Sequence, residues 1–386
     1  MAPQPQRPDG KTFLAAVTTV AAVYVYFLIF AQFGFLRAVE AAWGGAEGVV
    51  HSILGGMGLA GIVGSMIAAR VFAPGRGARL MTTGWALCAL AAGGTPWAES
   101  IAAFSVVAVG TGLGVGLLTV TLAGVLRPAT SDGRLGLIIG LGTGLAYGFC
   151  NLPGVFDASI ATQARLALAA AVIGFGASRA LRPQFEDEPP RTGDFSRAGI
   201  ACWVLVFLAL VGLDSALFHF IQHTPELKQA LWTGAGQQGL NAAVHAGAAA
   251  LAGWALDRRW GGRTVWLAAG ALLAAGWWIG GRHAGYAAGA LIYIASVSAY
   301  STALVFYPAR SGRPAVAALV YAIAGWGGSA AGIGLAEGRA DWPSALTVGA
   351  AALLAAGLMG RYFASRPGPA MNENTPGSPT HTRPPL

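Results

Sequence analysis

Long apolar runs, separated by short charged clusters, constrain the fold of this chain more than any other feature. The runs are about 20 residues long, the length of helix that crosses the roughly 30 Å of hydrocarbon in a bilayer. Only 10% of the 386 residues are charged, whereas a soluble domain has about 25%. Because lipid offers no partner to backbone polar groups, each run must be helical. The sequence therefore predicts an all-α integral membrane protein.

The pattern predicts twelve transmembrane helices. Most of the 24 Lys and Arg residues fall in alternate connections, on the side of the N-terminus, as the positive-inside rule requires of cytoplasmic loops. Both termini are therefore expected in the cytoplasm, with many passes through the cytoplasmic (inner) membrane. The predicted ranges are 12–35, 47–72, 79–94, 98–126, 135–152, 159–181, 198–221, 232–256, 264–281, 284–307, 314–336 and 343–364.

The chain divides near its middle. The segment RPQFEDEPPRTGDFSR, rich in Pro and acidic residues, is its longest polar interior stretch. Each half also carries an apolar helix, a short basic turn with Gly and another apolar helix at an equivalent place, which suggests the internal duplication found in many transporters. The predicted units are a cytoplasmic N-terminal tail (1–11), an N-terminal six-helix bundle (12–181), a cytoplasmic linker (182–197), a C-terminal six-helix bundle (198–364) and a disordered cytoplasmic tail (365–386).

A loop motif in the second half carries a family resemblance. Gly253, Asp257, Arg258, Gly262 and Arg263 resemble the loop signature of the major facilitator superfamily, which is a Gly, then an acid and a base, then Gly and basic residues. In that family the signature lies between spans two and three and, in a weaker form, between spans eight and nine. The resemblance implies two pseudo-symmetric six-helix bundles and a secondary transporter that works by alternating access.

The first half departs from the family pattern. Ala68 stands four residues after Gly64, where the family usually has an acid. The antiporter signature of span five is incomplete in LGTGLAYGFCNLPG because its Pro comes late, so the drug:proton antiport class gains no support. The resemblance implies that DRRWGGR (257–263) and APGRGAR (73–79) hold the two halves together on the cytoplasmic side. The expected gating residues are Asp257, Arg258, Arg263, Arg76 and Arg79.

Polar residues interrupt the predicted seventh and eighth spans. Gln238, Asn241 and His245 follow an i, i+3, i+7 spacing and share one face of span eight. In span seven His219 and His223 share a face, with Asp214 deeper in the helix. Polar groups that faced lipid would cost several kcal/mol each, so they are expected to point into the helix bundle. A carboxylate within the bilayer is expensive and indicates a functional site.

Simpler structural interpretations of the same residues stay open. Asn and Gln in membrane helices often only hydrogen-bond across an interface, for about 1 kcal/mol. Asp214 could belong to a buried ion pair, and His223, beside Thr224 and Pro225, could lie in water at the outer boundary. His219 and His245 could be structural histidines with satisfied hydrogen bonds.

The resemblance gathers some of these residues with others. Spans one, four, seven and ten usually line the central cavity of the family. Span ten carries YIASVSAYSTALVFY, whose Tyr293, Ser296, Tyr300 and Ser301 can face such a cavity. The residues expected to bind or couple the substrate are Asp214, His219, His245, Asn241, Gln238, Gln32 and Tyr300.

Two transport functions compete. One is the proton-coupled movement of a small organic solute, with Asp214 and a histidine as the titrating pair. The other is transition-metal transport, because imidazole suits Cu, Zn and Ni. Its expected ligands are His219, His223 and His245, and it would resemble the copper-importing branch of the facilitator superfamily. That branch's MxxxM and HxxxM pairs are absent from this sequence.

Other classes of function have less support in the sequence. No catalytic constellation lies at a membrane face, so an enzyme is not expected, and no cofactor is expected either. A non-transporting assembly factor or sensor stays possible. The net charge of +8 fits cytoplasmic loops rather than nucleic-acid binding. The expected partners are a small-molecule or ion substrate and the lipid bilayer, and the chain is expected to act as a monomer.

Overall fold

The computed structural model describes residues 10–130, 133–181, 196–258, 260–281, 286–337 and 342–364. Within these ranges the chain forms helices and no strands, so the all-α prediction is confirmed. The predicted linker, apart from its last two residues, the C-terminal tail and residues 1–9 of the N-terminal tail lie outside the described residues. Gly10 and Lys11, predicted as tail, already belong to the first helix.

The helices follow the predicted ranges closely. The first half contains α1 (Gly10–Val25), the π-helical stretch η1 (Tyr26–Gly34), α2 (Phe35–Trp43), α3 (Glu47–Val71), α4 (Gly77–Gly94), the 3-10 turn η2 (Thr95–Trp97), α5 (Ile101–Ala129), α6 (Leu135–Cys150) and α7 (Ile160–Arg179). The second half contains α8 (Arg197–His223), α9 (Pro225–Trp232), α10 (Ala235–Asp257), α11 (Gly261–Gly280), α12 (Tyr286–Ser311), α13 (Pro314–Leu319), the π-helical stretch η3 (Val320–Gly327), α14 (Gly328–Glu337) and α15 (Trp342–Ala364). The first span continues to Trp43, well past its predicted end, and α9 was not predicted.

Seven helical stretches among the described residues are long and apolar enough to cross a membrane. They are Gly10–Trp43, Glu47–Val71, Ile101–Ala129, Ile160–Arg179, Arg197–His223, Ala287–Ser311 and Pro314–Glu337. Helix α6 and residues Leu346–Tyr362 of α15 are apolar but shorter. These helices make the chain a multi-pass membrane protein.

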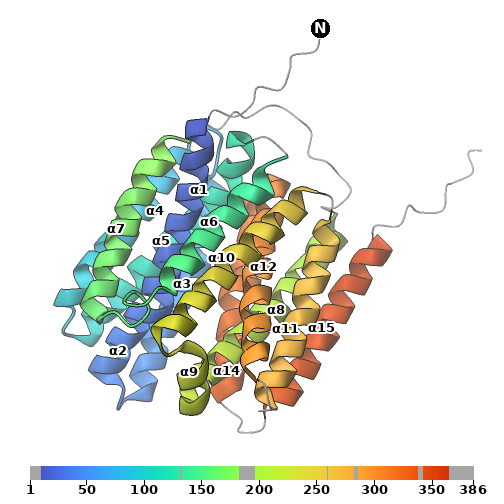
Figure 1. Ribbon diagram of the computed structural model, residues 1–386. Helices are drawn as coiled ribbons and strands as arrows, with labels where there is room; N and C mark the ends of the chain where they lie inside the picture. The colour runs from blue at the N-terminus through green and yellow to red at the C-terminus, as the bar shows by residue number, and fades with distance from the viewer. Residues whose placement is uncertain are drawn as a thin grey trace, which may run out of the picture.

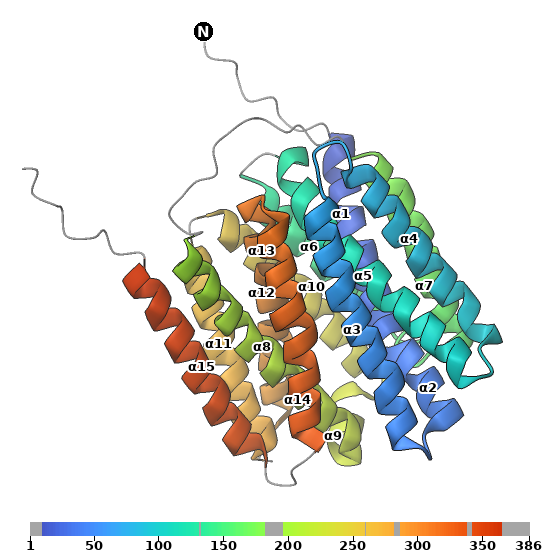
Figure 2. The ribbon, with the colours of Figure 1, turned by 180° about the vertical axis from the view of Figure 1, so that it is seen from behind.

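The helices of each half pack mainly on one another. In the first half α5 packs against α3 and α4, and α1 packs against α6 and α7. In the second half α8 packs against α14 and α15, and α12 packs against α10 and α11. Figures 1 and 2 show the first half, blue to green, beside the second half, yellow-green to red. Helix α1 begins and α15 ends at the same end of the molecule, the upper end in Figure 1.

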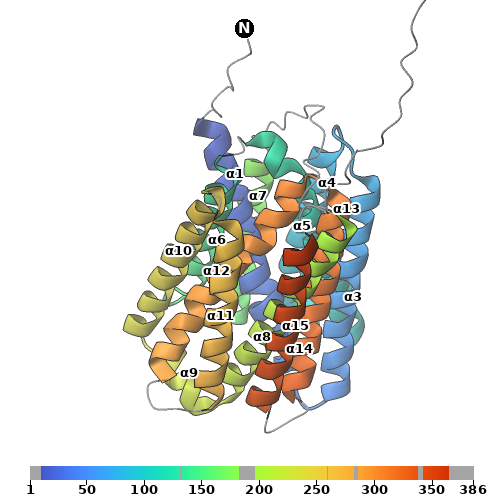
Figure 3. The ribbon, with the colours of Figure 1, turned by 90° about the vertical axis from the view of Figure 1, so that its right-hand side faces the viewer.

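Several helix pairs join the halves, on two sides of the molecule. Helix α3 packs against α13 and η3. There the ring of Trp326 fills the space in which a Cβ on Gly61 would lie, and its edge meets Phe27 of η1 with the ring centroids 6.4 Å apart. On the other side α6 packs along α10, beside α12 (Figures 1 and 3).

The crossing of α6 and α10 is a contact of backbone against backbone. A Cβ on Gly253 of α10 would collide with the carbonyl oxygen of Gly136 and would lie 2.9 Å from the Cα of Gly140. Gly136, Gly140 and Gly144 recur every four residues along α6, the small-residue spacing that lets membrane helices approach closely. The two halves therefore touch here without interlocking side chains.

This close approach predicts opposite effects for two alanine substitutions in α10. Gly253→Ala should lower the thermal stability of the purified protein, because overpacking costs roughly 1–3 kcal/mol. Gly247→Ala is the matched control, since nothing lies within 4 Å of its added Cβ. Alanine favours a helix over glycine by about 1 kcal/mol, so this control should be neutral or stabilising. Equal melting temperatures for the two variants would contradict the close crossing.

Candidate functional site

Asp214, midway along α8, is held by two tyrosine hydroxyls from α12. Tyr293 Oη donates a hydrogen bond to Oδ1 at 2.5 Å, and Tyr300 Oη donates one to Oδ2. The two tyrosines are seven residues apart, so they share one face of α12. Both are buried, at 3% exposure, whereas Asp214 is partly exposed. Among the described residues no Lys, Arg or His lies within ion-pair distance of Asp214, so a buried ion pair is not its role.

A second hydrogen-bonded group adjoins this carboxylate. The ring of Tyr147 on α6 stacks on His245 of α10, with centroids 4.7 Å apart and planes 14° apart. The Tyr147 hydroxyl hydrogen-bonds with Ser301 Oγ at 3.1 Å, and His245 Nδ1 hydrogen-bonds with Ser298 Oγ at 2.7 Å. Tyr24 of α1 donates to the carbonyl oxygen of Ser301 at 3.0 Å. The serines of α12 thus tie together α1, α6 and α10.

The two groups form one polar cluster. Ser301, which hydrogen-bonds with Tyr147, directly follows Tyr300, which donates to Asp214, along α12. We call this set the tyrosine–aspartate cluster; its members are Asp214, Tyr24, Tyr147, Tyr293, Tyr300, His245, Ser298 and Ser301. Two of its five helices belong to the first half of the chain and three to the second. The cluster therefore offers one carboxylate, one imidazole and several hydroxyl groups where the halves meet.

Three of the predicted site residues, Asp214, His245 and Tyr300, come together in this cluster. The sequence also identified Tyr293 and Ser301 as residues that can face the cavity. Tyr147 was noted as a polar residue of span five but was not among the expected site residues, although a tyrosine in the glycine-rich sequence LGTGLAYGFC of α6 is a signal for an interface position. Wherever small residues bring a helix close to its neighbours, a large polar side chain between them must lie at an interface.

Gln238 and Asn241 are engaged by the protein itself at the opposite, lower end of α10. Gln238 Nε2 donates to Asp157 Oδ2 at 2.6 Å, a bond between the two halves. Asn241 Nδ2 donates to the carbonyl oxygen of Leu231 at 2.8 Å, and its Oδ1 accepts from Gln237 Nε2 at 2.9 Å. Their buried amides hold the connection between α9 and α10, which matches the structural interpretation of these residues.

The three histidines expected to bind metal do not gather. His219 and His223 stack on each other, with centroids 3.9 Å apart, and His223 Nδ1 donates to the His219 carbonyl oxygen at 2.8 Å. They lie at the lower end of α8, whereas His245 lies in the tyrosine–aspartate cluster. Among the described residues no group of three or more His, Cys, Asp and Glu side chains could hold a metal ion.

Gln32 lies in η1, is partly exposed and hydrogen-bonds with no described residue. Its neighbour Phe33 meets Phe218 of α8 edge-on, with ring centroids 5.4 Å apart. It meets Phe156 in the same way, also at 5.4 Å. Phe218 follows Asp214 by one helical turn. Aromatic rings from both halves therefore meet just below the carboxylate.

Asp257, expected at the gate, joins α10 to the start of α6. Its Oδ1 accepts from the Gly136 N–H at 2.7 Å and its Oδ2 accepts from the Leu137 N–H at 2.8 Å. These N–H groups lie in the first turn of a helix, where they lack helical partners and the helix dipole favours an anion. Partial burial raises the pKa of Asp257, while the two N–H groups act in the opposite direction.

The other expected gating residues play no such part among the described residues. Arg76, Arg79 and Arg263 are exposed and form no ion pair there. Arg258 stacks on Trp254 of its own helix, 4.9 Å from the ring centroid. A contact between the halves that the sequence did not single out is made by Arg127, whose Nη1 donates to the carbonyl oxygen of Arg310 at 3.1 Å. That bond joins α5 to α12 at the upper end.

Solved transporter structures share the arrangement of the helices over nearly the whole chain. The proton:xylose symporter XylE matches with a TM-score of 0.63 and 13% identity, covering 92% of this chain and 94% of its own. A bacterial homologue of the iron transporter ferroportin matches at 0.60 and 13% identity, covering 93% and 100%. The human organic anion transporter MFSD10 matches at 0.58 and 16% identity, covering 93% and 99%. The chain has the major facilitator fold. No family model and no curated protein matches the sequence itself.

The two hydrogen bonds of Asp257 predict the effect of removing its charge. In Asp257→Asn one oxygen still accepts a hydrogen bond, but the amide group turns a donor toward the other N–H. A hydrogen bond to a charged group contributes about 1.5–3 kcal/mol, so conformers separated at the upper end should become about tenfold or more populated. Distances between spin labels on α4 and α11 would measure this. The exposed Glu47→Gln is the control. An unchanged distance distribution in Asp257→Asn would show that the Asp257 hydrogen bonds do not hold the upper end closed.

Proposed function

We propose that this chain is a secondary active transporter that moves a small solute across the cytoplasmic membrane together with protons, by alternating access. In this proposal twelve spans form two pseudo-symmetric six-helix bundles, residues 12–181 and 198–364, and both termini are cytoplasmic. The upper end of the molecule is then the cytoplasmic end. The observation that carries the proposal is Asp214, a carboxylate without a basic partner among the described residues, inside a polar cluster built by both halves.

Asp214 is the group best suited to carry the proton. A charge within the bilayer is costly unless it is paired, and the two tyrosine hydroxyls only share its charge by hydrogen bonding. Proton binding removes the charge, and a change of exposure from one side to the other changes how readily the proton leaves. His245 is held between Tyr147 and Ser298, which fixes the position of its imidazole ring in the cluster.

Contacts that can open exist between the halves at both ends. At the upper end the bonds are those of Asp257 to α6 and of Arg127 to α12. At the lower end they are the Gln238–Asp157 bond and the ring contact of Phe33 with Phe218. Each closure consists of a few polar or aromatic contacts. The glycine crossing of α6 and α10 lies between them and offers a pivot for rocking of the halves.

The composition of the cluster narrows the solute. It contains hydroxyl groups, one imidazole and one carboxylate, and no described Lys or Arg bonds to Asp214. Asp214 would repel an anionic solute, because no cation compensates its charge. It would not repel a neutral hydroxylated solute, and it would attract a positively charged one. The xylose, iron and organic-anion transporters named above share only the fold with this chain, so their different cargoes do not decide among these classes.

Asp214→Asn should abolish accumulation driven by a pH gradient. With one proton per solute, a gradient of one pH unit supports at most about tenfold accumulation, and the ratio should fall to about 1 in the variant. Proteoliposomes with an imposed pH gradient and a panel of radiolabelled sugars, amines and amino acids would measure it. Asp214→Glu, which keeps the acid, should retain part of the coupling. Full proton-driven accumulation by Asp214→Asn would exclude this role for Asp214.

The same cluster predicts the charge of stabilising ligands. Ligands that bind the folded state raise its melting temperature. Among matched neutral, cationic and anionic solutes added to the purified protein, the stabilisers should be neutral or cationic. Tyr300→Phe should reduce the rise in melting temperature that these ligands cause. Tyr26→Phe should not, because Tyr26 donates to the Cys88 carbonyl oxygen outside the cluster. Stabilisation by anions alone would contradict the assignment.

A further inference from the structure

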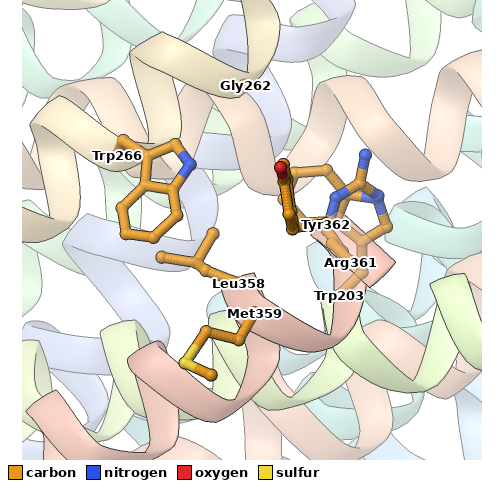
Figure 4. Close-up of a pocket in the computed structure, with 7 residues that line it drawn as sticks. All are labelled: Trp203, Gly262, Trp266, Leu358, Met359, Arg361 and Tyr362. Carbon is orange, nitrogen blue, oxygen red and sulfur yellow. The ribbon is translucent and has the colours of Figure 1, made fainter. Parts of the chain in front are cut away.

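A separate cavity of about 470 Å³ opens at the upper end of the second half. It lies between the first turns of α8 and α11 and the last turns of α15, and none of its lining residues belongs to the tyrosine–aspartate cluster. Figure 4 shows Trp266 on one side of an open space and Tyr362 with Arg361 on the other. Leu358 and Met359 close the space from below in that view.

Arg361 gives the cavity a fixed positive charge. Its guanidinium carbon lies 3.9 Å from the ring centroid of Trp203, and the Trp203 ring lies 3.8 Å from the ring of Tyr307. This aromatic column holds the flat guanidinium in place, which is the arrangement that cation–π contacts favour. Trp203 is only 3% exposed and its Nε1 has no hydrogen-bond partner among the described residues. The wall of the cavity therefore holds a cation in a fixed place, stacked on a buried ring.

The other walls are apolar and face outward. Trp266, Met359 and Tyr362 are 52%, 57% and 57% exposed. Exposed apolar side chains of a membrane protein are favourable where lipid covers them. Trp and Tyr are typical of the level of the lipid headgroups, where one part of the ring is in hydrocarbon and the other is hydrated. The cavity thus combines the positive charge of Arg361 with an adjoining apolar surface that acyl chains could cover.

The start of α11 adds a place for a phosphate oxygen. Gly262 lines the cavity, lies in the first turn of α11 and has nothing within 4 Å of the position of a Cβ. N–H groups in a first turn have no helical acceptor, and an anion beside them is stabilised by the helix dipole. Arg361 and this open first turn favour the same kind of ligand, one with an anionic group.

We propose that this cavity binds the headgroup of an anionic glycerophospholipid from the adjacent leaflet. The guanidinium of Arg361 would pair with the phosphate, and the acyl chains would lie along Trp266, Leu358 and Met359. Basic pockets between transmembrane helices on the cytoplasmic side commonly bind such headgroups. A lipid fits better than free phosphate because most of the lining is apolar. The proposal does not depend on the solute or on proton coupling.

Lipid retention by the purified full chain tests this site. Native mass spectrometry would compare phosphatidylglycerol with phosphatidylcholine of the same acyl chains, and with inorganic phosphate. The wild-type protein should prefer phosphatidylglycerol. Arg361→Gln should lower the affinity for phosphatidylglycerol about tenfold, or by about 1.4 kcal/mol. Arg361→Lys should keep part of the preference, because it retains the charge and loses the planar stacking.

A matched variant separates this site from general attraction to basic loops. Arg179 lies in the last turn of α7, also at the upper end, and stacks on Phe175 at 5.6 Å. Arg179→Gln should therefore leave phosphatidylglycerol binding unchanged. If Arg361→Gln fails to fold, the exposed Trp266→Ala should still weaken the lipid. Equal loss in the two arginine variants, equal binding of the two lipids, or displacement by millimolar inorganic phosphate would each overturn the proposal.

Discussion

The lack of hydrogen-bond partners in lipid organises this molecule. An unpaired polar group in hydrocarbon costs several kcal/mol, so a polar side chain in a span is strongly favoured when it finds a partner within the protein. Asp214 finds two tyrosines, His245 finds a serine, and Gln238 and Asn241 find the chain around α9. The same requirement produces both a functional cluster and ordinary structural bonds, and only the partners distinguish them. Asp214 differs because its partners leave its charge uncompensated.

The small residues of the chain decide how the two halves meet. Along α6 and α10 the contact is backbone against backbone, from Gly136 and Gly253 at one end toward Gly148 and Ala242 at the other, where it is looser. Side chains that interlocked here would resist a change of angle between the helices. A smooth crossing restrains the distance between the halves more than their angle. The carboxylate of Asp257 at the upper end is then a contact that can open without unpacking a core.

Hydropathy was enough to predict the long apolar helices, since lipid leaves the backbone no alternative. The same pattern identified Asp214 and His245, because ionisable groups inside a span must point inward, whereas Tyr300 was predicted from the family resemblance. It could not separate them from Gln238 and Asn241. The sequence shows that these residues share a face. It does not predict helix α9, whose carbonyl groups accept hydrogen bonds from the two amides. The predicted metal site is not formed, for a similar reason. The i, i+4 spacing puts His219 and His223 side by side, but a metal site also needs ligands that converge from other elements.

Charge balance gives the proposed cycle its coupling. If the halves close over Asp214 from both sides, an empty site would carry a carboxylate through the membrane interior with only two hydroxyls to share its charge. A proton removes that cost, whereas a neutral solute does not and has to travel with the proton. Movement of the empty, ionised site is then the slow step, and transport of the solute without a proton is suppressed. One carboxylate without a basic partner is sufficient to impose this rule, provided that no arginine or lysine enters the cluster during the cycle.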